Sequence, residues 1–255
     1  MAGQITALAP QREPRRGGRE RVSVFVDGEF ALGLDAEVAA RAGLTVGATL
    51  SDDDIARLRD GDEATRHYND ALRFLSFRPR SAVEVERYLR GRGADDIMTT
   101  AVVGRLRRVG LVDDEAFARY WIENRGAFSP RGDRALQAEL RAKGVDPGRI
   151  DEALEETEAE TGAGEEERAY QAGHKRLRLL ARLDEDEFRR RMYAFLQRRG
   201  FGYGTARAVV ERLWSERDES ERDESERDES ERDESERDES ERDESERDES
   251  ERGKP

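Results

Sequence analysis

Apolar residues recur three or four positions apart between Ala64 and Trp214, which is the spacing of helices that bury one face. A capping-box sequence at residues 81–84 predicts the start of one helix, and Gly93 predicts its end. Gly110 is expected to end the helix after that one. The apolar positions of these first helices are Tyr68, Leu72, Leu75, Val85, Tyr88, Leu89, Ile97, Val102, Val103 and Leu106.

This helical pattern is repeated along the chain. Five residues return 51 positions later, where Phe77, Pro79, Arg80, Leu89 and Gly93 become Phe128, Pro130, Arg131, Leu140 and Gly144. The spacing of the apolar residues and the helix-ending glycine returns once more 107 positions later. The residues there are Leu196, Gly200, Val209, Val210 and Leu213. We therefore predict a mainly α fold with three tandem three-helix repeats, at residues 63–110, 111–162 and 163–214. Repeats that contact mainly their neighbours form an elongated, curved array.

Residues 1–62 have a different pattern, in which β-branched and aromatic residues predict a small β part. Asp27-Gly28 is a strong signal for the tight turn of a β-hairpin. The expected elements are strands at 5–8, 21–26 and 29–34 and short helices at 35–44 and 51–60. The acidic run Asp52–Asp54 is assigned to a helix start, where carboxylates are favoured by the helix dipole, rather than to a metal site.

The end of the chain has a low-complexity composition. From Ser215 the pentad SERDE occurs seven times, and residues 215–255 hold 22 acids and 9 bases. The remaining residues, 1–214, hold 38 acids and 37 bases, so the formal net charge of −14 comes almost entirely from this tail. Such a sequence cannot bury apolar surface, and we expect a disordered segment or a solvated helix.

The charge of the helical part is uneven. Residues 64–144 hold 16 bases and 11 acids, and residues 168–214 hold 12 bases and 5 acids. Between these two basic blocks, residues 145–167 hold one base and ten acids. The pattern indicates electrostatic recognition of an anionic partner, or helix faces that are simply solvated.

Catalytic motifs are missing from the sequence. Without cysteine there is no thiol nucleophile or thiolate metal site. His67 and His174 have no second ligand at helical spacing, and GFGYG at residues 200–204 fits a helix stop better than a dinucleotide loop. We expect a protein that is not an enzyme and that uses no cofactor or metal.

The aromatic residues that accompany the bases allow two interpretations. Phe74, Phe77, Tyr193 and Phe195 lie beside arginines, as in nucleic-acid-binding surfaces. Their helical spacing favours the interpretation that the rings are core residues. Contact between Lys or Arg and phosphates would not require them.

The N-terminus lacks the apolar core of a signal peptide, and no apolar run approaches the roughly 20 residues that span a bilayer. We therefore expect a soluble, cytoplasmic protein that does not contact a membrane.

Three segments carry a family resemblance: ALRFLSFRPRSAVEVERYLRGRG, RLRRVGLVDDEAFARYWIENR and SPRGDRALQAELRAKGVD. They resemble the RecX family, regulators of the RecA recombinase, and residues 21–58 are similar to the N-terminal extension of many bacterial members. The match covers nearly all of residues 1–214, whereas the SERDE tail departs from the family pattern.

The resemblance implies a regulator that lies along the groove of the filament formed by RecA on single-stranded DNA. Such a regulator opposes filament extension and depresses ATP hydrolysis, LexA cleavage in the SOS response, and strand exchange in recombination and DNA repair. The expected partners are RecA and its filament, with weak DNA backbone contact and the protein as a monomer. The alternative is a direct DNA-binding regulator that grips phosphates without the recombinase.

A row of bases is the candidate partner-binding site. Arg92, Lys143 and Arg199 stand just before the glycine that ends the middle helix of each repeat. The helix dipole favours a cation there, which is a purely structural explanation. The middle helices carry more bases than the helix dipole requires. We therefore predict that the following residues contact RecA or DNA: Arg80, Arg87, Arg90, Arg92, Arg131, Arg141, Lys143, Arg198 and Arg199.

The family motif GLVDDEAFARYW begins at Gly110, the last residue of the first repeat, and continues into the second repeat. We interpret it structurally, as a helix stop, an N-terminal cap at Asp113 and a packed apolar face. Its residues are Gly110, Leu111, Asp113, Asp114, Phe117, Ala118 and Trp121.

Overall fold

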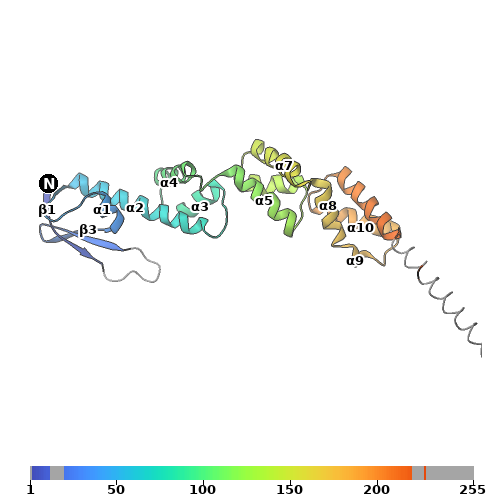
Figure 1. The fold of residues 1–255 in the computed structure, drawn as a ribbon, viewed down its shortest axis with the longest axis horizontal. Helices are drawn as coiled ribbons and strands as arrows, with labels where there is room; N and C mark the ends of the chain where they lie inside the picture. Colours follow the sequence, from blue (N-terminus) through green and yellow to red (C-terminus); the bar gives the residue numbers. More distant parts are fainter. Residues whose placement is uncertain (1, 12–19, 220–226, 228–255) are drawn as a thin grey trace, which may run out of the picture. The chain divides into compact units, whose positions relative to one another are not determined.

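The computed structural model describes residues 2–11, 20–219 and 227. These residues belong to two compact units. The first unit contains the residues up to Tyr120 together with Leu140–Ile150, and the second contains Trp121–Glu139 together with the residues from Asp151 onward. Most of the described chain is helical, and the strands lie near the N-terminus (Figure 1).

The N-terminal part is a four-stranded antiparallel sheet. Its strands are β1 (Ala2–Pro10), β2 (Arg21–Val26), β3 (Glu29–Asp35) and β4 (Thr49–Ser51), in the order β3-β2-β1-β4. The predicted hairpin is confirmed, because Asp27 and Gly28 have φ of 50° and 85°, the left-handed values that a type I′ turn requires. The sheet packs with helix α1 (Ala36–Arg41) around a small core that includes Ile5, Val24 and Leu34. Strand β4 was not predicted, since three residues are too few to show an alternating pattern.

Helix α2 (Asp52–Leu75) is one helix of 24 residues where the sequence indicated two. The expected break near residues 61–63 is wrong, and Gly61 lies inside the helix. The hydroxyl of Thr65 donates to the Gly61 carbonyl, and Asp62 binds Arg21 of β2 at 2.9 Å. The helix therefore joins the sheet to the first repeat. Its acidic start belongs to a capping box between Ser51 and Asp54.

The first repeat is completed by α3 (Ala82–Gly91) and α4 (Asp96–Arg108). The capping box of Ser81 and Glu84 is present as predicted. The residues expected to face the core do so: Val85, Leu89, Val102, Val103 and Leu106 are buried, and Tyr68, Leu72, Leu75 and Tyr88 pack against them. Ile97 differs, because 84% of its surface is exposed.

Two further three-helix repeats follow, as predicted. The helices of the second repeat are α5 (Asp114–Phe128), α6 (Asp133–Ala142) and α7 (Pro147–Thr161). Those of the third are α8 (Glu165–His174), a short α9 (Leu177–Leu180), α10 (Glu185–Arg198) and a last helix described over 203–219. Phe188, Met192, Leu196, Val209 and Leu213 lie in the core of the third repeat.

The middle helix of every repeat ends in the same hydrogen-bonded turn. The carbonyl oxygens of Leu89, Leu140 and Leu196 accept from the N–H groups of Ala94, Val145 and Phe201, at 3.1, 3.1 and 3.3 Å. The glycines inside these turns, Gly93, Gly144 and Gly200, have φ of 88°, 81° and 85°. This is the Schellman motif, in which the left-handed residue favours glycine. The repeated Leu-x-x-x-Gly spacing therefore specifies where each middle helix stops.

The last helix continues past Trp214 into the first SERDE pentad. The Glu216 carboxylate accepts from the Tyr170 hydroxyl at 2.9 Å, and the Arg217 guanidinium donates to the Leu183 carbonyl at 3.0 Å. The boundary expected after residue 214 thus lies too early, since this pentad packs on the third repeat. The other pentads, apart from Arg227, lie outside the described residues. Over the residues that are described, no helix combines the length and apolarity needed to cross a membrane.

Candidate interaction surface

An acidic residue connects neighbouring repeats at the same place twice. Asp114, the first residue of α5, accepts a hydrogen bond from the backbone N–H of Ala82 at 2.8 Å. Glu165, the first residue of α8, accepts one from the N–H of Asp133 at 3.1 Å. Both partners of the second bond stand 51 positions after those of the first. Each acid therefore caps the middle helix of the preceding repeat.

A second connection joins the start of one middle helix to the end of the next. The Ser81 hydroxyl donates to the Lys143 carbonyl at 2.7 Å, and the N–H of Gly132 donates to the Arg199 carbonyl at 3.0 Å. Gly132 stands 51 positions after Ser81. A Cβ on Gly132 would overlap the backbone of Gly200, so the second contact depends on glycine.

The three bases of the predicted row differ in their exposure and in their contacts. The Lys143 ammonium binds Glu84 at 2.9 Å, and the Arg199 guanidinium donates to the Pro130 carbonyl at 3.0 Å. Both side chains are thus part of the junctions that hold repeats together. Arg92 is exposed, with its guanidinium 5.2 Å from the Tyr88 ring centroid. Lys143 and Arg199 are therefore half-buried whereas Arg92 is exposed, and contact of the three with a partner stays a prediction.

The remaining predicted bases divide by exposure. Arg80 is half-buried with its guanidinium 4.0 Å from the Phe74 ring, and Arg131 is half-buried with its guanidinium 3.8 Å from the Glu139 carboxylate. Burial and the neighbouring charge of Arg78 lower the pKa of Arg80. Arg90 binds Asp96 at 3.0 Å. The other exposed bases of the set are Arg87, Arg141 and Arg198.

Glu84 is the charged centre of the junction between the first two repeats. Its carboxylate is held by Arg78 in a two-pronged ion pair, at 3.0 and 3.2 Å, and by Lys143 at 2.9 Å. Burial by itself would raise the pKa of this carboxyl group. The hydrogen bonds and charges of Arg78 and Lys143 outweigh that effect and lower the pKa from its ordinary 4.5 to about 2.

A pH dependence of stability follows from this depressed pKa. Because the folded pKa lies below the unfolded one, the stabilisation is present above about pH 4.5 and is lost as pH falls toward about 2. We expect Glu84→Gln to lower the free energy of unfolding at pH 7 by about 1.5–3 kcal/mol, as the loss of charged hydrogen bonds does. Urea unfolding at pH 7 and pH 3 measures this, and the difference between the two proteins should shrink at pH 3. An equal difference at both pH values would contradict the assignment.

The motif GLVDDEAFARYW behaves largely as interpreted. Gly110 ends α4 with φ of 71°, and the Asp113 carboxylate caps α5 by accepting from the N–H groups of Glu115 and Ala116. Phe117 and Ala118 are buried. Trp121 is half-buried and donates to the Glu139 carboxylate at 2.8 Å, whereas 47% of Leu111 is exposed. The capping of α3 by Asp114 was not predicted.

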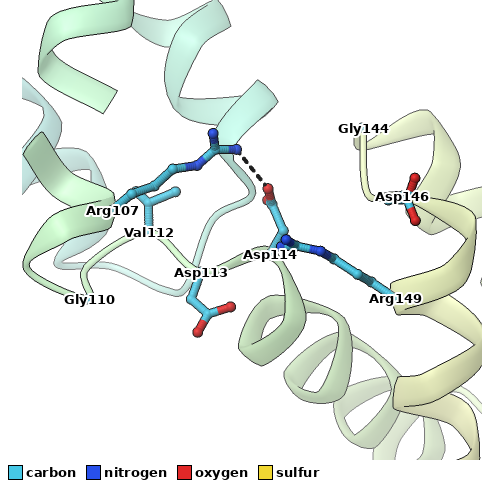
Figure 2. A pocket seen from close by; sticks show the side chains of 8 residues that line it. All are labelled: Arg107, Gly110, Val112, Asp113, Asp114, Gly144, Asp146 and Arg149. Atoms are coloured by element: carbon cyan, nitrogen blue, oxygen red, sulfur yellow. Dashed lines mark hydrogen bonds and ion pairs between the residues drawn. The ribbon is translucent and has the colours of Figure 1, made fainter. Parts of the chain in front are cut away.

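An open cavity of about 750 Å³ lies beside this motif in the first unit (Figure 2). Arg107 binds Asp114 across it at 3.1 Å. Its other two acids, Asp113 and Asp146, accept hydrogen bonds from backbone N–H groups of their own helix starts. Within the described part of the chain, no cluster of three or more His, Cys, Asp or Glu could hold a metal ion. The lining residues are Arg107, Gly110, Val112, Asp113, Asp114, Gly144, Asp146 and Arg149.

Two phenylalanines of the repeated sequence are exposed. Phe77 has 78% of its surface exposed and Phe128 has 81%. The interpretation that the rings beside arginines are core residues holds for Phe74, which stacks on Tyr88 at 4.2 Å, but is wrong for Phe77. Phe77 also lines a cavity of about 430 Å³ together with Pro79 and Leu111. Equivalent positions thus present an aromatic side chain to solvent in the first and second repeats.

The fold and its repeated junctions define a helical-repeat protein of three three-helix domains behind a small N-terminal sheet. Family models agree with this division along the chain. The first, second and third three-helix domains of RecX match residues 68–106, 113–154 and 164–222. The N-terminal domain of the regulatory protein RecX matches residues 3–51.

The chain belongs to the RecX family. It is 32% identical over 215 residues to the regulatory protein RecX of Bacillus subtilis (strain 168), a match that covers 84% of this chain and 79% of that protein. It is 40% identical over 156 residues to the regulatory protein RecX of Mycolicibacterium smegmatis, a match that covers 59% of this chain and 81% of that protein. The relatives are named as regulatory proteins.

Solved structures share the fold. A crystal structure of a regulatory protein RecX has a TM-score of 0.65 at 22% identity and covers 82% of this chain and 99% of its own. The crystal structure of RecX from Lactobacillus salivarius has a TM-score of 0.53 at 22% identity. This match covers 60% of this chain and 97% of that one.

Proposed function

We propose that this protein is a negative regulator of RecA that binds the recombinase and its filament on single-stranded DNA. Lying along the filament groove, it opposes filament extension and inhibits the ATPase, coprotease and strand-exchange activities. It acts in the cytoplasm as a monomer, without catalysis of its own, and thereby restrains homologous recombination, DNA repair and the SOS response. Membership of the RecX family supports this proposal.

The repetition of one surface is the observation that carries the proposal. Phe77 and Phe128 are exposed at equivalent positions, each at the end of the first helix of its repeat. A helical polymer of identical subunits also presents the same surface at regular intervals. A protein whose repeats display the same aromatic side chain can contact several subunits, and each contact raises the effective concentration of the next.

Exposed bases add an electrostatic contribution to this contact. Arg87, Arg92, Arg141 and Arg198 are exposed on middle helices or at their ends. In our proposal these four contact acidic groups of RecA or phosphates of its DNA. Of the half-buried bases in the predicted set, Lys143 and Arg199 also hold the junctions between repeats, whereas Arg80 and Arg131 contact Phe74 and Glu139 of their own repeats.

A titration of RecA ATPase tests the function. Wild-type protein is added to RecA on single-stranded circular DNA, and ATP hydrolysis is followed as a function of the molar ratio. We expect inhibition at ratios well below one protein per RecA, because a bound regulator blocks extension of a whole filament. Affinity for naked DNA of the same length, measured at the same salt concentration, should be much weaker.

Two results would count against the proposal. Unchanged ATPase activity at an equimolar ratio would exclude a regulator of the filament. Naked DNA bound as tightly as the filament, with a strong salt dependence, would favour the alternative of a direct DNA-binding regulator.

A further inference from the structure

The third repeat contains a hollow of about 290 Å³ lined by two tyrosines and three arginines. The rings of Tyr193 and Tyr203 meet edge to face, with centroids 5.5 Å apart and an interplanar angle of 76°. Tyr203 has 59% of its surface exposed. The lining residues are Arg189, Arg190, Tyr193, Tyr203, Arg207, Val210 and Glu211.

Local structure holds both rings in place. Gly200 ends α10 with φ of 85°, and the buried Phe201 anchors the turn, so the last helix starts with Tyr203 at the surface. The Tyr193 hydroxyl accepts a hydrogen bond from the Gln197 amide at 2.8 Å. The segment GFGYG, interpreted from the sequence as a helix stop, thus also presents the side chain of Tyr203 at the surface. An exposed ring that is already oriented loses little conformational entropy when a ligand stacks on it.

The charged side chains that line the hollow are three arginines and one glutamate. Arg189 binds Glu185 and Glu211, and Arg190 binds Glu187. Arg207 is exposed and makes no ion pair with any described residue. Burial raises the pKa of Tyr193, the neighbouring Tyr203 adds to the rise, and the charge of Arg134 opposes it.

We propose that this hollow binds a base of single-stranded nucleic acid, with the base stacked on Tyr203 and the adjoining phosphate held by Arg207. An exposed ring offers a stacking face to any base, and nearby arginines bind the backbone without reading sequence. Bases in a duplex are already stacked and cannot enter. An acidic peptide would satisfy the arginines but would leave the tyrosine face unused. The inference goes beyond the proposed function and its alternative, because neither of them assigns a site for a stacked base.

Fluorescence anisotropy of a labelled 20-nucleotide oligo(dT), titrated with full-length protein at low salt, tests the site. Tyr203→Ala is expected to raise Kd about tenfold, within the range for loss of one stacked base. Tyr203→Phe keeps the ring and should stay within about twofold of wild type. Phe30→Ala is the matched control, since Phe30 is also 59% exposed but lies in the N-terminal sheet.

Two ligand controls separate stacking from charge. A duplex of the same length and an abasic oligomer with the same phosphates should bind Tyr203→Ala and wild type equally. Arg207→Gln should lower the slope of log K against log salt for oligo(dT) by about 0.7, the value for one phosphate contact on a single strand. Arg149→Gln, at another exposed arginine, serves as its control.

Several results would overturn the site. The first is an unchanged oligo(dT) affinity in a Tyr203→Ala protein with wild-type circular dichroism. The second is an equal loss of affinity for the abasic oligomer, and the third is displacement of labelled oligo(dT) by a poly-glutamate peptide as effectively as by unlabelled oligo(dT). Absence of any oligo(dT) binding by the wild type would do the same. The ATPase titration is independent of these measurements, so failure of the site leaves the proposed regulation of RecA standing.

Discussion

Phe117→Ala is expected to destabilise the protein by about 3–5 kcal/mol, the cost of removing a buried aromatic side chain from a packed core. Phe117 lies on α5 and is only 1% exposed. Its removal leaves a cavity that a close-packed interior does not refill. Urea unfolding followed by circular dichroism measures the effect. A loss of this size is a large part of the stability of an ordinary domain, so the variant should also lose function through unfolding.

Phe128→Ala provides the matched control for this prediction. It removes the same side chain from the same helix, but Phe128 is 81% exposed. Its stability should stay within about 0.5 kcal/mol of wild type, as for most surface substitutions. A stable and inactive Phe117→Ala protein would show instead that this face of α5 is an interface.

The sequence predicts the helices of this fold well because its signals are local. The capping box here involves only Ser81 and Glu84, and a Schellman turn needs only a left-handed residue, usually glycine, just after the helix end. Apolar residues at helical spacing identified the core of the first and third repeats, including Leu106 and Leu213. These features depend on neighbours within one turn of helix, so a single sequence carries them.

Contacts between distant residues were not predicted. The sequence groups Lys143 with the other bases that precede a helix-ending glycine, but it does not show the ion pair of Lys143 with Glu84, 59 residues away. The continuity of α2 past Gly61 was missed for a similar reason. A glycine costs about 1 kcal/mol inside a helix, and packing of that helix against the sheet and the first repeat outweighs this cost.

The sequence does contain one signal of the junctions between repeats. Asp114 and Glu165 are both acidic and stand 51 positions apart, the offset that relates Phe77 to Phe128. An acid at the first position of a helix is normally explained by the dipole of its own helix. Here each carboxylate caps the middle helix of the preceding repeat. A repeated acid in a repeat protein can therefore indicate a contact between repeats.

Replacement of both exposed phenylalanines, Phe77→Ala and Phe128→Ala together, is expected to weaken inhibition of RecA ATPase at least about a hundredfold. Aromatic anchors at protein interfaces commonly contribute about 2 kcal/mol or more each, and contributions from separate sites add. Each single replacement should therefore weaken inhibition of RecA ATPase roughly tenfold or more. Because both side chains are exposed, melting of the variant should match wild type.

The design separates a specific contact from general loss of apolar surface. Ile97→Ala is the control, since Ile97 is 84% exposed on α4 but has no exposed apolar counterpart in the repeated sequence. It should inhibit like wild type. If the double variant melts normally and still inhibits RecA at the wild-type ratio, the repeated phenylalanines do not bind the filament. A loss confined to one of the two positions would show that one repeat, rather than a surface repeated along the chain, makes the contact.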